Sequence, residues 1–196
     1  AAQSGVIIPK PGSDTRYYIF TAPQINQIST PYAWSEVDMT GNNGLGDVVS
    51  ATKNTFMGAN ATEKLTVARH CNNLDFWVIM HHANGNRFSV RLVDASGVQA
   101  AKSFNLGGYV DNSTWTKANY LKLSLDQSLL IHPIGPASLG SYDSVVEIYD
   151  FDNATGTISG PKLTIDGFSY AYAAELSADN RLMYVSDIST QGTSYI

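Results

Sequence analysis

The feature that most constrains the fold is an internal repeat. A short apolar strand, a tight polar turn and a second strand recur four times, starting at Gly5, Lys64, Tyr120 and Ala174. Residues matched between the four second strands are 58, 53 and 53 residues apart, and they are Tyr18, Phe76, Leu129 and Leu182. A period of this length indicates a repeat architecture in which each unit is one supersecondary motif.

A second hairpin pattern follows each of the first three copies. An alternating strand reaches a turn rich in Asn and Gly, and the chain then resumes as another strand. Glycine and asparagine supply the positive φ that a tight hairpin requires. The three strands and turns are Trp34–Met39 before Gly41, Phe88–Asp94 before Ser96 and Gly97, and Val145–Asp152 before Asn153.

Each period therefore holds four short strands and no helix pattern, which is typical of one blade of a β-propeller. A β-sandwich would also contain many short strands, but it gives no reason for a four-strand unit to recur. We predict an all-β chain, residues 1–196 forming a propeller fragment of about three and a half four-stranded antiparallel blades. The predicted blades are 5–57, 63–106, 119–166 and an incomplete 172–196, whose strand near Tyr184 should face further polypeptide.

Composition excludes several classes of function. The chain has 196 residues and a net charge of −5, and its 12 Lys and Arg residues form no cluster, which argues against nucleic-acid binding. No run of about 18 apolar residues is present, so no membrane-spanning helix is expected. Cys71 is the one cysteine, which rules out an intrachain disulfide. A charged content of 15% is common in β-rich secreted proteins.

Four blocks of sequence follow one another along the chain. They are Ile8–Ser13, Tyr17–Thr21, Val37–Thr40 and Gly44–Val48; then Glu63–His70, Phe76–His81 and Asn86–Phe88; then Tyr120–Ser124 and Glu147–Gly156; and last Ala174–Ser186. In this order they resemble the N-terminal β-propeller region of type IX-secreted, gliding-motility-associated bacterial surface proteins. The resemblance implies an extracellular or outer cell-surface location, further domains, and recognition by a secretion machinery. It carries no catalytic residues and no cofactor. The turns at Ser124 and Ser177 depart from the usual Ser-Pro-Asp-Gly.

The histidines and the cysteine are the first candidates for chemistry. His81 and His82 are neighbours on a strand and should point to opposite faces, so they cannot share one metal without a bend. His132 and His70 are interpreted as ordinary histidines at strand ends. His70 precedes Cys71, but adjacent residues usually diverge, and we expect an unreactive loop thiol rather than a thiolate–imidazole pair.

No other pattern predicts a catalytic or metal site. The turn from Asp150 to Asn153 could offer oxygen ligands to calcium, but hairpins require such residues anyway. Gly44–Asp47 lacks the Lys-Ser/Thr of a phosphate loop. The expected inner strands carry one carboxylate, Glu175. We therefore predict no catalytic residue, no metal and no cofactor. The alternative is a lactonase-like propeller hydrolase with a metal at the central channel, and Glu175 is then the first candidate ligand.

Aromatic residues in the connecting loops predict binding instead. Exposed rings beside Asn, Ser and Gly can stack on sugars or anchor a protein, although most are expected to pack between blades. The candidates are Tyr109, Trp115, Tyr142 and Tyr170, with Tyr120 and Tyr172 nearby. The segment Asp143-Ser144-Val145 resembles a bacterial O-glycosylation acceptor, with Ser144 in a surface loop. Sequons for N-glycosylation start at Asn60, Asn112 and Asn153. The expected function is a non-catalytic surface scaffold for adhesion or for protein or glycan binding, within a larger secreted protein.

Overall fold

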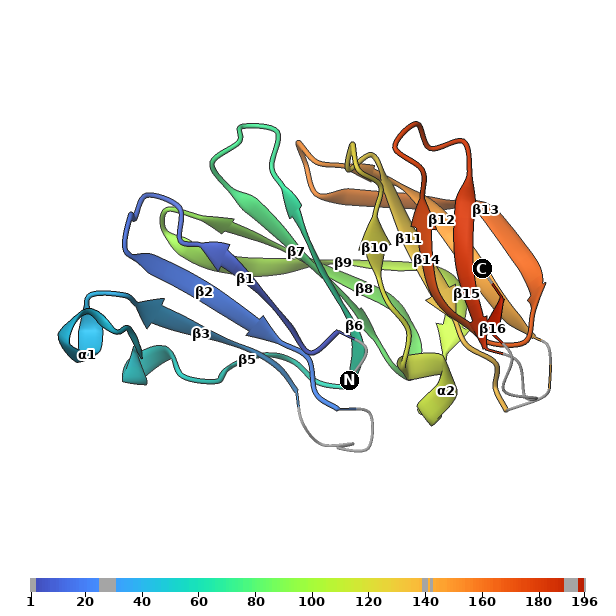
Figure 1. Ribbon diagram of the computed structural model, residues 1–196, viewed down its shortest axis with the longest axis horizontal. Coiled ribbons are helices and arrows are strands. Elements are labelled where there is room, and N and C mark those ends of the chain that lie inside the picture. The colour runs from blue at the N-terminus through green and yellow to red at the C-terminus, as the bar shows by residue number, and fades with distance from the viewer. Residues whose placement is uncertain (1–2, 25–30, 139–140, 142, 189–193, 196) are drawn as a thin grey trace.

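Four antiparallel β-sheets lie side by side along the molecule (Figure 1). The computed structural model describes residues 3–24, 31–138, 141, 143–188 and 194–195. In the first sheet the order is β1 (Gly5–Pro9), β2 (Arg16–Thr21), β3 (Tyr32–Asp38) and β4 (Asp47–Val48), and β5 (Thr55–Gly58) also pairs with β3. The second sheet consists of β6 (Ala61–Arg69), β7 (Phe76–His82), β8 (Gly85–Asp94) and β9 (Gly97–Val110).

The third and fourth sheets repeat the same up-and-down order. The third consists of β10 (Lys122–Leu123), β11 (Leu129–Ile134), β12 (Ser144–Asp152) and β13 (Thr157–Phe168). The fourth consists of β14 (Ala171–Leu176), β15 (Met183–Ile188) and β16 (Ser194–Tyr195). The described helices are short: α1 (Gly41–Gly44), α2 (Thr114–Lys117) and the 3₁₀ turn η1 (Ser50–Thr52). Within the described part of the chain, none could cross a membrane.

The predicted fold class is confirmed: the chain is all-β, and its antiparallel sheets, of which the second and third are four-stranded, correspond to propeller blades. The first strands of successive sheets touch one another, β1 against β6, β6 against β10 and β10 against β14. The outer strands β9 and β13 are also in contact. The sheets are therefore stacked face to face, with β6 on the inner edge of its blade as predicted.

The turn between the first two strands has the same type of closing hydrogen bonds in all four sheets. Each turn contains a residue with positive φ, and a backbone N–H donates to the carbonyl three residues earlier. In the first sheet the positive-φ residue precedes this donor, whereas in the other three it is the donor itself. The positive-φ residues are Gly12, Asn73, Gln127 and Asn180. A second backbone hydrogen bond closes each turn, and its acceptor carbonyls belong to Arg16, Asp75, Leu129 and Leu182. The residues two positions after these acceptors are therefore equivalent, and they are Tyr18, Trp77, Ile131 and Tyr184. Relative to Tyr18, the sequence alignment is therefore wrong by one residue at Phe76 and by two residues at Leu129 and Leu182. The first turn is one residue longer than the others, which accounts for one residue of the error.

Packing between the first and second sheets buries aromatic side chains of β2 and β3. Tyr18 and Phe20 lie against Phe76, Val78 and other apolar residues of the second sheet. The Tyr32 hydroxyl donates to the carbonyl of His81 at 2.7 Å and accepts from the N–H of Thr62 at 3.1 Å. This buried hydroxyl ties the first sheet to two strands of the second.

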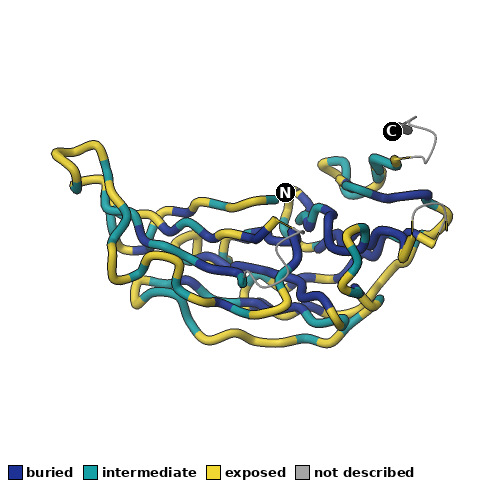
Figure 2. The backbone as a smooth tube through the Cα atoms, turned by 90° about the horizontal axis from the view of Figure 1, so that it is seen from below, coloured by how far each residue is buried: buried dark blue, intermediate teal, exposed yellow. Residues whose placement is uncertain are grey.

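The same arrangement recurs between the next sheets, and Figure 2 shows buried backbone running through the stack. Trp77, Ile79 and Phe88 of the second sheet pack against Leu130, Tyr149 and Phe151 of the third. Ile131 and Val146 pack in turn against Ala171 and Ala174 of the fourth. The second and third sheets thus each use one face for the sheet before and the opposite face for the sheet after.

The β12–β13 hairpin closes over the indole of Trp77. Trp77 Nε1 donates to the carbonyl of Asn153 at 2.8 Å. Gly156, with φ of 67°, lies so close that a Cβ there would stand 2.6 Å from the indole ring. The hairpin therefore requires glycine both for its backbone conformation and for contact between the second and third sheets.

We expect Gly156→Ala to lower the free energy of unfolding by about 2–4 kcal/mol, the sum of left-handed strain and overpacking against Trp77. Gly167→Ala is the matched control: its φ is 88°, but a Cβ there meets nothing within 4 Å. Its free energy of unfolding should fall by only about 1–2 kcal/mol, because the substitution adds backbone strain and no steric contact. Urea unfolding of the three proteins measures the difference, and equal losses would contradict the packing role of Gly156.

Candidate ligand-binding site

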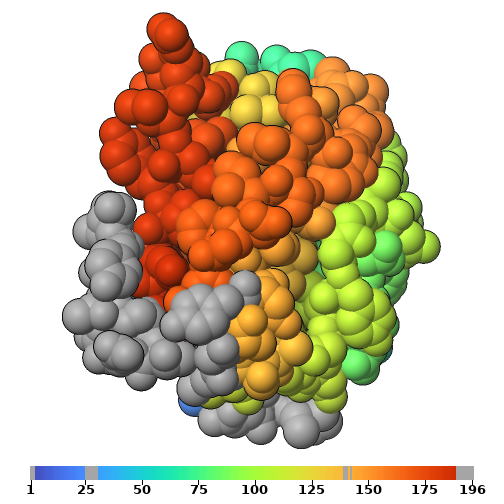
Figure 3. All heavy atoms as spheres, turned by 90° about the vertical axis from the view of Figure 1, so that its right-hand side faces the viewer, coloured from blue at the N-terminus to red at the C-terminus, as the bar shows by residue number. Residues whose placement is uncertain are grey.

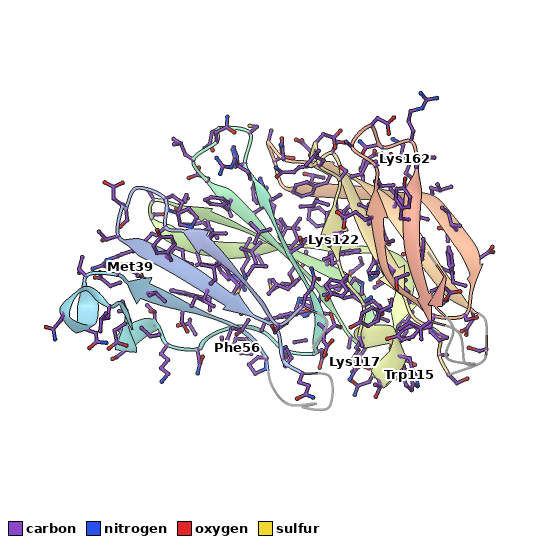
Figure 4. The ribbon with its side chains drawn as sticks, viewed as in Figure 1. Met39, Phe56, Trp115, Lys117, Lys122 and Lys162 are labelled. Atoms are coloured by element: carbon purple, nitrogen blue, oxygen red, sulfur yellow. The ribbon has the colours of Figure 1, made fainter. Side chains whose placement is uncertain are left out.

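A pocket of about 270 Å³ opens between the second and third sheets at the end of the molecule that carries α2. Figure 4 shows this end, with Trp115 and Lys117 of α2 labelled. One wall comes from the end of β9, another from the loop that leads into α2, and the third from the end of β11 and the start of β12. The lining residues are Gly108, Tyr109, Asp111, Thr116, Ile134, Gly135, Ala137, Asp143 and Val145.

Asp111 is held rigidly at the pocket wall. Its Oδ1 accepts hydrogen bonds from the N–H of Ser113 at 2.7 Å and from Thr116 Oγ1 at 2.5 Å. Burial alone would raise the pKa of Asp111, but the hydrogen bonds from Thr116 and Ser113 outweigh it and lower the pKa. Asp111 is therefore an ionised acceptor near neutral pH.

Asp143 supplies a second carboxylate from the loop before β12. Its Oδ1 accepts from the N–H of Ala137 at 3.3 Å and from the hydroxyl of Ser141. Tyr109 stands at the same pocket with 62% of its surface exposed. The pocket thus combines two carboxylates with one free aromatic ring.

The other predicted aromatic residues have different surroundings. Tyr170 is buried, its ring lies 5.8 Å from those of Trp115 and Tyr172, and its hydroxyl donates to the carbonyl of Ala118 at 3.1 Å. The prediction that Tyr170 is free to touch a ligand is therefore wrong, because both its ring and its hydroxyl are used inside the fold. Trp115 is partly buried beside it, and Tyr142 lies outside the described residues.

Ser144 is not in a surface loop, and that prediction is wrong. Its side chain is fully buried at the start of β12. Its Oγ donates to the carbonyl of Ile134 at 2.7 Å and accepts from the N–H of Ala171 at 2.9 Å. The hydroxyl joins the third sheet to the fourth, and the packed interface offers no room for a sugar.

A buried polar cluster lies behind the pocket. Glu147 of β12 accepts from the N–H of Gly108, a pocket residue, at 2.9 Å, and from the hydroxyl of Tyr149. Lys64 of β6 is fully buried, and its Nζ donates to Asn119 Oδ1 at 3.1 Å and to the carbonyl of Pro133. Burial holds the pKa of Lys64 well below its usual value.

Sequence reasoning missed this cluster. The repeat predicts a strand that begins at Lys64, whereas β6 begins at Ala61 and also includes Glu63; both charged side chains are buried. A charged pair directly before an apolar strand is thus a weak signal for an early strand start.

The two stacked histidines come from different sheets. His81 of β7 and His132 of β11 have ring centroids 4.4 Å apart, and both are fully buried. His82 points to the opposite face, where Nε2 lies 2.5 Å from Ser89 Oγ, so the predicted divergence of His81 and His82 is confirmed. The ring nitrogens of His81 and His132 have no hydrogen-bond partner among the described residues, although Glu147 Oε2 lies 3.7 Å from His132 Nδ1.

Other sequence candidates serve the backbone. Cys71 Sγ lies 3.6 Å from His70 Nδ1, closer than expected, but that nitrogen also accepts from the N–H of Asn72 at 3.1 Å within the exposed turn. Glu175 pairs with Lys122 at 3.2 Å on the surface. In the ranges that the structure describes, no three His, Cys, Asp or Glu side chains are placed to hold a metal ion.

Comparison with known proteins supports the fold alone. No family model and no curated protein sequence matches the chain. A functionally unknown protein from Desulfotomaculum acetoxidans DSM 771 is 11% identical with a TM-score of 0.53, over 98% of this chain and 56% of that one. An exo-beta-1,3-galactanase from Phanerochaete chrysosporium is 11% identical with a TM-score of 0.47, over 98% and 49%. The chain thus spans about half the length of these structures.

Burial disfavours the charged forms of His81 and His132 and holds each pKa well below its usual value. The unfolded chain therefore binds protons near pH 6.5 that the folded chain does not bind. It follows that stability is full above this pH and declines as the pH falls below it. Each histidine should account for about 1 kcal/mol of the loss in free energy of unfolding between pH 7 and pH 5.5.

We expect His132→Phe to keep most of its stability at pH 7.5, because the ring packs against His81, Phe88 and Tyr149 without a hydrogen bond to lose. Its loss of stability between pH 7 and pH 5.5 should be smaller than that of the unmodified protein. Urea unfolding at several pH values tests this. An unchanged pH dependence would show that His132 titrates normally.

Proposed function

We propose that this chain is part of a non-catalytic β-propeller that binds a glycan in the pocket beside α2. The observation that carries the proposal is the exposed ring of Tyr109 next to two carboxylates, Asp111 and Asp143, in one pocket. An aromatic face covers the apolar C–H surface of a sugar, and carboxylate oxygens accept hydrogen bonds from its hydroxyl groups. Small pockets with a few convergent polar groups are the usual form of such sites.

Preorganisation of the wall also supports binding. Asp111 is held by Ser113 and Thr116, so a ligand would not have to order that side chain. Gly135 is tightly enclosed by Trp115 and Tyr170, which fixes the floor of the pocket. The ring of Tyr109 is largely exposed, so it has room to turn toward a ligand.

A glycoside hydrolase is the second candidate, because two carboxylates flank the pocket and glycosidases use such a pair. The general acid of such an enzyme needs a raised pKa, whereas the pKa of Asp111 is lowered by its hydrogen bonds. A metal-dependent hydrolase would need ligands that converge at the inner strands, and Glu175 is engaged with Lys122 instead. These observations favour binding over turnover.

The proposed setting is outside the cell or on its outer surface, within a larger secreted protein that passes through a secretion machinery. The low charged content and the likeness of the sequence blocks to surface propellers support this setting. The natural partner is then a glycan of the surroundings or of a neighbouring surface, and adhesion is the role that such binding would serve.

We expect the chain to bind at least one member of a panel of neutral gluco-, galacto- and manno-oligosaccharides by titration calorimetry. Tyr109→Ala should weaken this binding at least tenfold, because the stacking ring is lost. Asp143→Asn should weaken it less, because the amide keeps one acceptor oxygen. Phe56→Ala is the matched control, since Phe56 is 65% exposed on β5, away from the pocket.

Two results would contradict the proposal. Loss of binding in Phe56→Ala equal to that in Tyr109→Ala would show that the oligosaccharide does not use this pocket. Release of reducing sugar by the unmodified chain, abolished in Asp111→Asn, would establish the hydrolase instead.

A further inference from the structure

The pocket beside α2 carries negative charge that the protein does not neutralise by direct contact. Asp111 comes from the loop before α2, and Asp143 comes from the loop before β12. The ion pairs among the described residues engage other carboxylates, those of Glu36, Asp38, Glu147, Asp150 and Glu175. Both pocket carboxylates are therefore available to a positively charged ligand.

Lys117 of α2 lies close to the pocket, but its ammonium group is engaged elsewhere. Its side chain is buried, and its Nζ donates to Asn112 Oδ1 at 3.0 Å. It is near enough to act on the charge of Asp111 without forming an ion pair with it. A cleft lined by charges of one sign concentrates the electric field and attracts ions of the opposite sign. The two carboxylates thus favour a cation over a neutral group.

Each of the two carboxylates keeps one oxygen for a ligand. Oδ1 of Asp111 accepts hydrogen bonds from the loop that leads into α2, and Oδ1 of Asp143 accepts from the loop that precedes β12. In the part of the chain that the structure describes, neither Oδ2 accepts a hydrogen bond. An ammonium group has three N–H donors and no acceptor, so it suits such oxygens better than a hydroxyl group does.

The rest of the lining suits a sugar ring. Gly108, Gly135 and Ala137 carry little or no side chain, and the ring of Tyr109 is 62% exposed beside them. A volume of about 270 Å³ lies near the lower end for ligand pockets, which favours one sugar residue. The outer strands of the two sheets that form the pocket lie side by side, β9 in lime green and β13 in orange in Figure 3. Contact between these sheets fixes the width of the pocket before a ligand binds.

We propose that the pocket beside α2 selects a glycan whose bound sugar carries a protonated amino group. This inference rests on the proposed glycan site and adds the charge of the ligand to it. The ammonium group donates to the Oδ2 atoms of Asp111 and Asp143, and the C–H face of the sugar lies on the ring of Tyr109. A neutral sugar makes weaker hydrogen bonds at the same place, and an acidic sugar is repelled by both carboxylates.

The test is titration calorimetry of the whole chain with matched gluco- and galacto-tetrasaccharides that differ only at C2, where they carry a hydroxyl, an acetamide or a free amine. At pH 6, in at least one of the two series, the amine form should bind about tenfold more tightly than the hydroxyl form, because its hydrogen bonds are charge-assisted. The acetamide form should bind no more tightly than the hydroxyl form. At pH 9 the preference for the amine form should disappear, because the amine is then neutral, as an α-amino group would be, while the carboxylates stay ionised.

Asp111→Asn and Asp143→Asn each remove one negative charge with little change of shape. Each should reduce the preference for the amine form at pH 6 by about threefold, with a smaller effect on the hydroxyl form. Asp166→Asn is the matched control, since Asp166 is exposed on β13 and does not line the pocket, and it should keep the full preference. Circular dichroism and thermal unfolding establish that each variant folds.

The possible failures of the two proposals can be told apart. Equal binding of the amine and hydroxyl forms at pH 6 would overturn the selection of an amino sugar and leave glycan binding in place. Binding of none of the tetrasaccharides would overturn both proposals. A preference that survives in both pocket variants would show that the ammonium group does not contact these carboxylates. Binding of trilysine as tight as that of the amine form would overturn the sugar as the ligand class, because charge alone would then explain the preference.

Discussion

The structure depends on the face-to-face packing of successive sheets. In this packing, the second strand of a sheet places one large side chain against the next sheet. Tyr18 and Trp77 occupy equivalent positions and are both almost fully buried by the sheet that follows. The turn before each second strand sets this position, because hydrogen bonds of the same type close each turn and each contains a residue with positive φ. A local turn therefore determines which residue enters the interface between sheets. The packing of each sheet on the next depends on this register.

The candidate pocket is a consequence of the same packing. It is lined by residues of the second and third sheets at the α2 end, where the loop through Asp111 and Thr116 crosses from the outer strand β9 to the inner strand β10. The buried cluster of Lys64, His132 and Glu147 lies behind this crossing. Polar groups are thus concentrated between these two sheets, whereas the contact between the first and second sheets is mainly apolar.

Sequence alone could predict the repeat, the strand content and the blade order, because turn residues and alternation are local signals. It could not predict the pairing of His81 with His132, which lie 51 residues apart and meet only when two sheets stack. The burial of Ser144 was missed for a related reason: a serine after a Gly-rich segment is typical of a loop, and its two hydrogen bonds come from the third and fourth sheets. Tyr109 was predicted to lie in a connecting loop, whereas it stands near the end of strand β9, with its ring exposed.

Tyr32 shows what such cross-sheet contacts mean for motion. Its hydroxyl holds the first sheet to β6 and β7 from inside the interface, and burial raises its pKa, so it stays a neutral donor. Because each sheet packs mainly on its neighbours in the chain, opening can start at either end without breaking the middle. Amide hydrogens of the second and third sheets, which pack against a neighbouring sheet on both faces, should then exchange with solvent more slowly than those of the first and fourth sheets.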